Sequence, residues 1–361
     1  EQHPDYDAFW QKIAVPRYVG VPRVPNLNVA GWWDQEDFYG PVKIYETLEK
    51  GDRAGRNYLV AGPWNHGGWA HGEGRTLGAV DFGSDTARYF RERIEAPWFA
   101  YWLKDKGDGK FPEARVFDTG SNRWDTYSAW PPREQTAERR LYTAAAGRLS
   151  FDPPQERSER AFDSYISDPA RPVPYRARPV GPTYGRPGWA TWLVEDQRFV
   201  HLRPDVLSWE TEPLERDMDI AGEIVAHVAA STTGSDADWV VKLIDVYPES
   251  YTADPKMSGY QVMIAPEIFR ARFRRGFEHA VAVEPDVVEE YAIGLHTHHH
   301  TFQKGHRIMV QVQSTWFPAF SRNPQKFVPN LFRAAPADYT AATQRVFRSR
   351  EHATYVSLPV R

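Results

Sequence analysis

The chain has 361 residues, a formal net charge of -4 and no cysteine. This length allows two domains with a substantial core, and the absence of cysteine excludes disulfides, thiol nucleophiles and zinc-thiolate sites. No basic run indicates nucleic-acid binding and no apolar run is long enough to span a bilayer, so we expect neither nucleic acid nor a membrane as a partner.

The first predicted unit is a strand, a helix and a second strand. Residues 1–24 are expected to form a short helix and a Pro-punctuated approach to this unit. Two short apolar runs, 27–30 and 58–61, then each end in Gly and a polar cluster, which is typical of buried parallel strands. The segment between them, from about Glu36 to Lys50, has apolar residues at helical spacing: Val42, Tyr45 and Leu48.

Asp34 follows the first of these strands and His66 follows the second. In a right-handed βαβ unit both strand ends lie on one edge of the sheet, where open α/β sheets hold their chemistry. An acid and a His in this order are two members of a nucleophile, acid and His triad, in which Asp34 would orient the imidazole and His66 would move the proton. A helix N-cap for Asp34 and a hydrogen-bonded loop position for His66 are the structural alternatives.

The nucleophile that such a triad requires is not found in the expected place. It should precede Asp34, yet no serine lies upstream of this residue and no G-x-S-x-G motif occurs in the chain. The nearest candidate, Ser121 after Gly120, lies downstream of His66. We therefore expect the chain to be the C-terminal part of a larger enzyme.

Beyond His66 the pattern changes from helix to strand. A Gly-rich loop, 67–74, precedes a predicted helix from Thr86 to Lys106, in which Phe90, Ile94, Phe99 and Leu103 share one side and Pro97 places a kink. After about residue 110, short β-rich runs separated by Pro, Gly and Asp clusters predict a β-sandwich. These runs are 115–117, 140–142, 224–228, 239–243, 261–264, 307–313 and 354–358. The Pro- and Arg-rich segment 168–188 is expected to be an extended surface loop.

Glu36 and Asp37 lie two and three positions after Asp34 and allow two interpretations. Acidic residues in a first helical turn are ordinary capping and dipole partners, and this interpretation is favoured by the local pattern alone. However, three carboxylates within four residues repel one another and need a compensating positive charge, which a substrate ammonium group can supply.

Other residue clusters suggest metal sites, but we expect none. On a strand, His296, His298 and His300 would share one face and form a possible ligand set, yet no acidic residue lies in the run. Asp236 and Asp238 lack the remaining ligands of a calcium loop, so a turn between strands is the preferred interpretation. The Gly-His-Arg sequence 305–307 is expected to form a tight turn that opens a strand.

Several motifs resemble those of a known superfamily. The sequences GWWDQED at 31–37 and GPWNHG at 62–67 resemble the acid and histidine motifs of the X-Pro dipeptidyl-peptidase, cocaine esterase and α-amino acid ester hydrolase superfamily. The WDQED string, the segment 305–318 and the RNPQ sequence at 322–325 are most similar to the α-amino acid ester hydrolases. The resemblance extends from His3 to the C-terminus.

This resemblance implies a fold and a set of roles. The fold class is α/β and then all-β, with the C-terminal part of an α/β-hydrolase domain in residues 1–110 and a jelly-roll β-sandwich in residues 111–361. Asp34 and His66 would be the catalytic acid and base, while Glu36 and Asp37 would bind the free α-amino group of the substrate. The family uses neither a metal nor a cofactor in these positions. It also implies a periplasmic or secreted enzyme, about which a chain that starts with Glu itself says nothing.

The leading hypothesis is a serine hydrolase or acyltransferase for α-amino acid esters and amides, including β-lactam antibiotics. An X-Pro dipeptidyl-peptidase or another acylase of the superfamily is the first alternative. A non-catalytic β-sandwich that binds carbohydrate or a partner is the second. The expected partners are a small aminoacyl substrate, the N-terminal part of the same enzyme, and further copies in a homo-oligomer.

Overall fold

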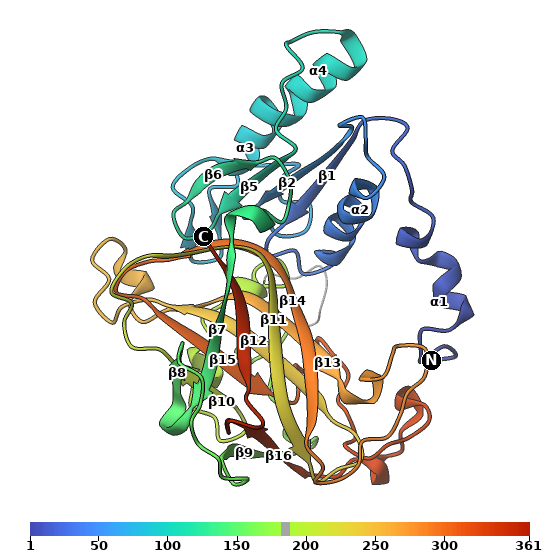
Figure 1. Ribbon diagram of the computed structural model, residues 1–361, viewed down its shortest axis with the longest axis vertical. Helices are drawn as coiled ribbons and strands as arrows, with labels where there is room; N and C mark the ends of the chain where they lie inside the picture. The colour runs from blue at the N-terminus through green and yellow to red at the C-terminus, as the bar shows by residue number, and fades with distance from the viewer. Residues whose placement is uncertain (182–187) are drawn as a thin grey trace.

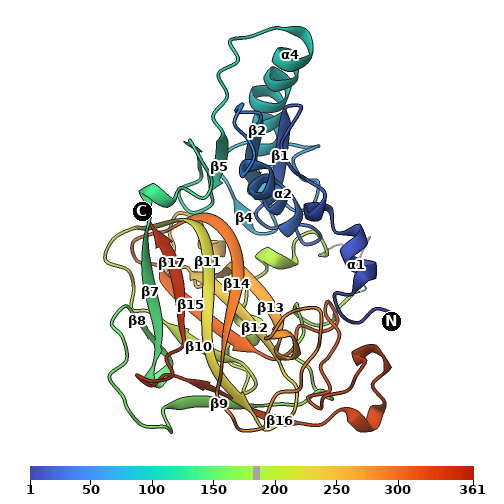
Figure 2. The same cartoon turned by 45° about the vertical axis from the view of Figure 1, so that its right-hand side comes forward.

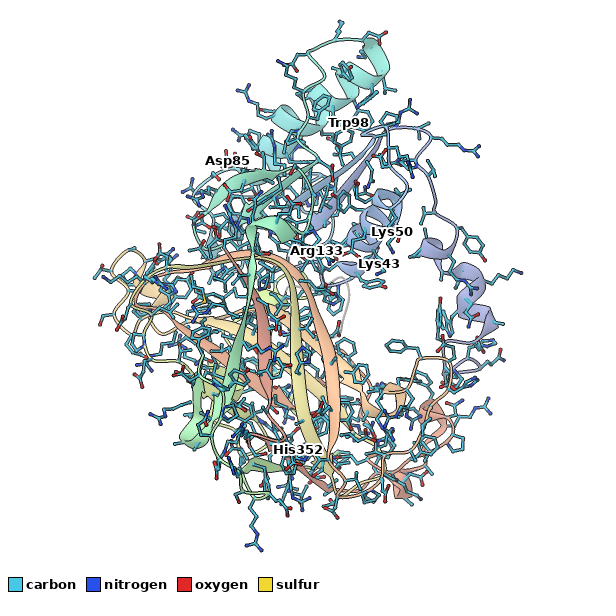
Figure 3. All side chains as sticks on the ribbon, in the orientation of Figure 1. Lys43, Lys50, Asp85, Trp98, Arg133 and His352 are labelled. Atoms are coloured by element: carbon cyan, nitrogen blue, oxygen red, sulfur yellow. The ribbon has the colours of Figure 1, made fainter. Side chains whose placement is uncertain are left out.

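The computed structural model describes residues 1–181 and 188–361. Figure 1 shows a small α/β region stacked on a larger body of long β-strands, with the C-terminus at the junction between them. In the side-chain view, Trp98 lies in the α/β region and His352 lies near the opposite end of the β-domain (Figure 3). The predicted order, α/β first and mostly antiparallel β second, is confirmed.

The α/β region is built on the predicted strand-helix-strand unit. Strands β1 (Asn26–Gly31) and β2 (Asn57–Gly62) pair in parallel, from Asn26 opposite Asn57 to Gly31 opposite Gly62. Helix α2 (Tyr39–Glu49) connects them and buries the three expected residues, Val42, Tyr45 and Leu48. It begins three positions later than predicted, because the residues after Asp34 form turns that are described below.

The sheet of this region continues beyond the expected domain boundary. Strand β5 (Ala114–Asp118) pairs in parallel with β2, and β6 (Arg123–Tyr127) pairs antiparallel with β5, so the strand order is β1-β2-β5-β6. The next strand, β7 (Ala137–Ala144), belongs to the large sheet. The change of sheet therefore lies between Tyr127 and Ala137, whereas the division at residue 110 stays a prediction about domains.

The predicted helix 86–106 is divided by a wide turn. It consists of α3 (Thr86–Tyr89), a π-helical segment (Phe90–Glu95) and α4 (Ala96–Lys104), with Pro97 in the first turn of α4. Phe90 and Ile94 are buried as expected. Phe99 and Leu103 are exposed, and Trp98 is the buried side chain of α4 instead. The π-helical turn holds more residues than an α-helical one, so the buried face moves by one position.

The N-terminal segment is short and loosely packed. It contains α1 (Ala8–Ile13) and a 3-10 turn (Val15–Arg17), and its apolar side chains Phe9, Trp10 and Ile13 are exposed. A two-stranded ribbon, β3 (Thr76–Leu77) and β4 (Val80–Asp81), follows the Gly-rich loop after β2. In the described part of the chain, the helices lack the combination of length and apolarity that spanning a membrane requires.

The β-domain is one extensively paired, mostly antiparallel sheet that curves on itself to enclose a core. Its strands are β7, β8 (Arg148–Ser150), β9 (Phe162–Ser167), β10 (Leu207–Glu210), β11 (Met218–Thr232), β12 (Asp238–Val246), β13 (Gln261–Arg270), β14 (Glu289–Phe302), β15 (Arg307–Gln313), β16 (Ala342–Phe347) and β17 (Tyr355–Val360). A single α-helical turn, α5 (Arg198–His201), and several 3-10 turns connect them. Figure 2 shows β11 and β14 running from the junction toward the far end of the molecule. Every predicted run beyond residue 130 coincides with one of these strands, except that Thr354 precedes the start of β17.

The predicted surface loop 168–188 is partly an interior segment. Val173 and Tyr175 are buried, and Pro174 forms a bridge with Phe317. Val173 packs with Val200 and Val206 in a small buried apolar cluster. The remainder of this prediction falls on residues 182–187, which lie outside the described residues.

Asp118, at the end of β5, joins the two regions. Its carboxylate accepts hydrogen bonds from the backbone and hydroxyl of Thr301 in β14, at 2.9 and 2.6 Å, and from Gly120 and Ser121 in its own turn. A Cβ on Gly120 would lie 1.9 Å from the Thr301 carbonyl oxygen, so the turn and β14 approach as closely as backbones can. Burial alone would raise the pKa of Asp118, but the His299 imidazole and these hydrogen bonds hold the pKa well below its usual range.

Lys242 is a buried cation in the middle of β12. Its side chain is inaccessible to solvent and its Nζ donates to Oε1 of Gln197 at 2.9 Å. Among the described residues no carboxylate pairs with it, and burial lowers the pKa of Lys242 from 10.5 to about 7. The folded protein therefore releases this proton at a pH where the unfolded chain still holds it.

We expect Asp118→Asn to lower the free energy of unfolding by about 3 kcal/mol, because the amide loses the charge-assisted bonds and turns an N–H₂ toward donors. Ser121→Ala, which removes one donor from the same cluster, should cost about 1 kcal/mol. Urea denaturation of both variants measures this difference. Equal losses in the two variants would show that the charge of Asp118 is unimportant.

Between about pH 7 and pH 10 the unfolded chain binds one more proton at Lys242 than the folded chain, so this residue makes stability rise with pH. Lys242→Met should remove that dependence, which amounts to about 1.4 kcal/mol per pH unit in the difference between parent and variant. Denaturant titrations across this range measure it. The exposed Lys326→Met serves as the control, and a parallel pH profile for Lys242→Met and parent contradicts the prediction.

Candidate active site

Asp34 and His66 meet at the predicted edge of the sheet. The Nδ1 atom of His66 lies 3.0 Å from both carboxylate oxygens of Asp34. The Asp34 side chain is 2% exposed, whereas that of His66 is 47% exposed. With Nδ1–H donating to the carboxylate, Nε2 is the nitrogen that can accept a proton at the surface. This arrangement can hold an imidazole in one tautomer and stabilise it when it becomes charged.

Backbone contacts between the two loops set this distance. The N–H of Trp32 donates to the Gly62 carbonyl at 2.8 Å and the N–H of Trp33 donates to the Trp64 carbonyl at 3.0 Å. The loops can approach in this way because Gly31 has no side chain, since a Cβ there would lie 2.4 Å from the Trp64 oxygen. The Gly at the end of the first strand is thus part of the geometry that joins acid and base.

Asp34 also organises the turn that follows it. Its Oδ1 accepts the backbone N–H groups of Glu36 at 2.8 Å and Asp37 at 2.9 Å. The N-cap alternative was close but wrong in detail, because these N–H groups belong to a turn and α2 begins only at Tyr39. The same bonds fix the carboxylate in the orientation that faces His66. Asp34 can therefore organise the turn and hold His66 at the same time.

Gln35 joins the acid loop to the His loop, a role that no local sequence pattern predicted. Its side-chain oxygen accepts the backbone N–H of His66 at 3.2 Å. The acid loop therefore holds the His loop at the backbone as well as at the imidazole. The WDQ string supplies both of these contacts from consecutive residues.

Glu36 and Asp37 are both exposed, but their carboxylates have different partners. Oδ1 of Asp37 accepts the N–H of Gly40 at 3.0 Å, in the first turn of α2. The capping interpretation is therefore correct for Asp37, although the residue remains exposed. Oε1 of Glu36 accepts the indole N–H of Trp189 at 2.9 Å and, more weakly, the side-chain amide of Gln35 at 3.4 Å. In the described residues Glu36 accepts no helix N–H group. Two negative charges thus stand beside the Asp34–His66 pair.

Two tryptophans anchor the acid loop in the protein interior. The indole N–H of Trp32 donates to the Phe117 carbonyl and that of Trp33 donates to the Met263 carbonyl, each at 2.7 Å. The ring of His298 stacks on that of Trp32, with 4.8 Å between ring centroids, and contacts the ring of Trp33 edge-on, with 5.6 Å between centroids. The loop that carries Asp34 is therefore supported by the α/β region and by the β-domain together.

The histidine run does not form the shared ligand face that was considered. His296 has a positive φ of 66°, and pairing between β11 and β14 shifts register next to it, so its side chain leaves the alternation and contacts Glu267 at 2.6 Å. His298 and His300 both contact the Thr119 hydroxyl, at 3.1 and 2.8 Å. These bonds give the run a structural role at the domain junction.

Another group has metal-ligating atoms close together. Asp118, Asp219 and His299 place one ligand atom each within 4.8 Å of one another. The guanidinium of Arg361 lies 3.1 Å from Asp219 and donates to Tyr127, so a positive charge is already present there. The group therefore serves as an ion-pair network at the junction.

The remaining candidates have structural partners. Asp236 and Asp238 lie at the turn between β11 and β12, as expected, and pair with Arg272 and Arg270. Gly305 and His306 form the turn that opens β15. The Ser121 hydroxyl donates to Asp118 at 2.6 Å and shares no hydrogen bond with His66 in the described residues. Ser121 is thus not positioned as the nucleophile.

A groove of about 640 Å³ lies between α2 and the segment that connects the two regions. Lys43, Lys50 and Arg133 line it (Figure 3), together with the acidic Glu46 and Glu49. It includes neither Asp34 nor His66. We therefore place the candidate site at the loops after β1 and β2 and not in this groove.

Comparison with known families covers both regions. Residues 100–357 match the family described as X-Pro dipeptidyl-peptidase C-terminal non-catalytic domain. Residues 1–68 match the family described as X-Pro dipeptidyl-peptidase (S15 family). The cocaine esterase of Rhodococcus sp. (strain MB1 Bresler) is 29% identical over 368 residues, which cover 99% of this chain and 60% of the esterase.

Solved structures give stronger likenesses. An aminopeptidase from the marine sediment archaeon Thaumarchaeota archaeon and an α-amino acid ester hydrolase each superpose with a TM-score of 0.95 at 46% identity. Each match covers 100% of this chain and 59% of the solved chain. The chain thus spans about three fifths of the length of these relatives.

We expect Gly31→Ala to separate the two loops, since the added methyl group would collide with the Trp64 backbone. The variant should lose about 2 kcal/mol of stability, and ester turnover by an enzyme carrying it should fall about 100-fold, because misplacement by 1 Å is enough for such a loss. Thermal unfolding and steady-state kinetics measure the two effects. Gly20→Ala, where nothing lies within 4 Å of the new methyl group, is the control. Unchanged turnover in Gly31→Ala would show that loop spacing does not limit catalysis.

Proposed function

This chain belongs to the family of X-Pro dipeptidyl-peptidases (S15) and cocaine esterases, and we propose that it is the part of a serine hydrolase that supplies the acid and base of the triad. The observation that supports this proposal is the position of the His66 imidazole. Its Nδ1 atom lies 3.0 Å from the buried carboxylate of Asp34, and the side chain is half exposed to solvent. The proposed substrates are esters and amides of α-amino acids, including β-lactam antibiotics. Asp34 is the acid and His66 is the base.

In the proposed reaction a serine from a region outside these residues attacks the acyl carbon. Nε2 of His66 takes the serine proton and gives it to the departing alcohol or amine, which leaves an acyl-enzyme. His66 next removes a proton from water, or from an amine such as a β-lactam nucleus. The deprotonated acceptor displaces the serine, which regains the proton. Asp34 stabilises the imidazolium that forms in each half-reaction.

The acidic pair supports the choice of an α-amino acyl group. Glu36 and Asp37 carry two exposed carboxylates in the turn that Asp34 organises, and an α-ammonium group is the complement that offsets their repulsion. The names of two relatives at 46% identity, an aminopeptidase and an α-amino acid ester hydrolase, agree with this substrate class. An anionic acyl group would be repelled by the same pair.

A second candidate reaction is hydrolysis of a peptide bond. One relative is an aminopeptidase, and both matching families are named for X-Pro dipeptidyl-peptidases. The same triad and the same ammonium site serve this reaction, and only the leaving group differs. A purely carbohydrate-binding or partner-binding role leaves the paired Asp34 and His66 without a purpose.

The α/β region has a free edge for the region that supplies the serine. Strand β1 is the outermost strand of its sheet, and Phe9, Trp10 and Ile13 of α1 are between 43% and 56% exposed. Open strand edges and clustered apolar side chains are typical of surfaces that another segment covers. We propose that the nucleophile-bearing region pairs with β1. From the resemblance alone we also propose export to the periplasm or medium and assembly into a homo-oligomer.

We expect Glu36→Gln and Asp37→Asn to impair use of α-amino acyl esters selectively. In the enzyme that includes the nucleophile-bearing region, each variant should lower kcat/KM for phenylglycine methyl ester about tenfold, because an ammonium loses a charged partner. Phenylacetic acid methyl ester, which lacks the amino group, should be hydrolysed as before.

Glu46→Gln, in α2 and in the groove that includes neither Asp34 nor His66, is the matched control for loss of a charge. Asp37→Asn should in addition lower the stability by up to about 1 kcal/mol, since the neutral amide loses the favourable interaction of a negative charge with the N-terminus of α2, whereas Glu36→Gln should not. Equal losses on the two esters would remove the ammonium role from the acidic pair. Replacing the ester by the corresponding phenylglycine amide distinguishes the esterase from the peptidase.

A further inference from the structure

A short arm of the β-domain, residues 188–195, lies against the active-site loops. The indole N–H of Trp189 donates to Oε1 of Glu36 at 2.9 Å, and Nδ2 of Asn65 donates to the Ala190 carbonyl at 3.1 Å. The arm therefore touches the acid loop and the residue before His66 at once. These partners are 153 and 125 positions apart in the sequence.

The β-domain itself fixes the position of the arm. Trp192 is buried and meets Tyr175 edge-on at 5.3 Å and Trp316 at 5.0 Å. The Tyr260 hydroxyl donates to the Val194 carbonyl at 2.9 Å. The ring of Trp189 lies 6.4 Å from that of Trp192. Packing within the β-domain thus supports the indole through residues that lie outside the acid loop.

The contact leaves Glu36 oriented and still charged. Glu36 is exposed, and an exposed glutamate ordinarily samples many rotamers, which a ligand must restrict at a cost in binding free energy. The indole N–H is a neutral donor, so it holds one oxygen without neutralising the carboxylate, as Arg or Lys would. In the described residues Oε2 of Glu36 accepts no hydrogen bond. One oxygen is therefore held and the other is available.

We propose that Trp189 is a positioning residue that holds Glu36 for the α-ammonium group of the substrate. This inference rests on the proposed function of Glu36. The β-domain, through its arm, then contributes to the selectivity for α-amino acyl groups although it contains neither Asp34 nor His66. Trp189 acts on the substrate only through Glu36.

The test measures selectivity in the enzyme that includes the nucleophile-bearing region. Selectivity is the ratio of kcat/KM for phenylglycine methyl ester to kcat/KM for phenylacetic acid methyl ester. Trp189→Phe keeps an aromatic ring and removes the N–H, so it should lower this ratio about fivefold to tenfold, through a higher KM for the amino ester and little change in kcat. The phenylacetic ester should be unaffected.

Trp102→Phe, in α4, is the matched control. It also removes an indole N–H, but that N–H has no hydrogen-bond partner in the described residues, so the ratio should not change. Because Trp189 acts through Glu36, Trp189→Phe should have no further effect on the ratio in a Glu36→Gln background.

The possible results separate the two proposals. A lower ratio in Trp189→Phe that disappears in the Glu36→Gln background supports the positioning role. An unchanged ratio, or equal losses on both esters, overturns it, and the proposed function stands if Glu36→Gln still lowers the ratio. If Glu36→Gln itself leaves the ratio unchanged, the ammonium role of Glu36 and the positioning role of Trp189 both fail.

Discussion

The buried carboxylate of Asp118 is the contact on which the arrangement of the two regions depends. It ends the central strand β5 and accepts hydrogen bonds from its own turn and from Thr301 of β14. A buried charge is tolerated only when its hydrogen-bonding capacity is filled, so this junction has one relative orientation at low free energy. Every contact between the β-domain and the active-site loops follows from that orientation.

The candidate site is therefore assembled from both regions. Local features of the α/β region bring Asp34 and His66 together, since parallel pairing of β1 and β2 places both loops at one edge. The β-domain then stabilises the acid loop, because the Met263 carbonyl accepts the indole N–H of Trp33 and the arm contacts Glu36. The loops carry the chemistry, while the β-domain determines where their side chains can lie.

The parts that the sequence predicts well are those determined by neighbours in the chain. The helical period of Val42, Tyr45 and Leu48 and the Gly-closed strands are local signals, and they placed Asp34 and His66 at one edge. The predictions that were wrong depended on features that are not local in the sequence. A π-helical turn moved burial from Phe99 to Trp98, and a register shift displaced His296 from the face of its strand. The partner of Glu36 lies in a distant arm, where no spacing rule could indicate it.

The division of labour between loops and arm bears on how such enzymes can diversify. In the proposed function, Asp34 and His66 are tied to each other and to the sheet, and we expect most changes in their loops to impair turnover for every substrate. In the part of the chain that the structure describes, side-chain contacts of Trp189 and Asn65 join the arm, 188–195, to those loops, and the β-domain supports the arm through Tyr260. A lineage could therefore exchange the arm and acquire a new acyl preference while its catalytic machinery stays intact.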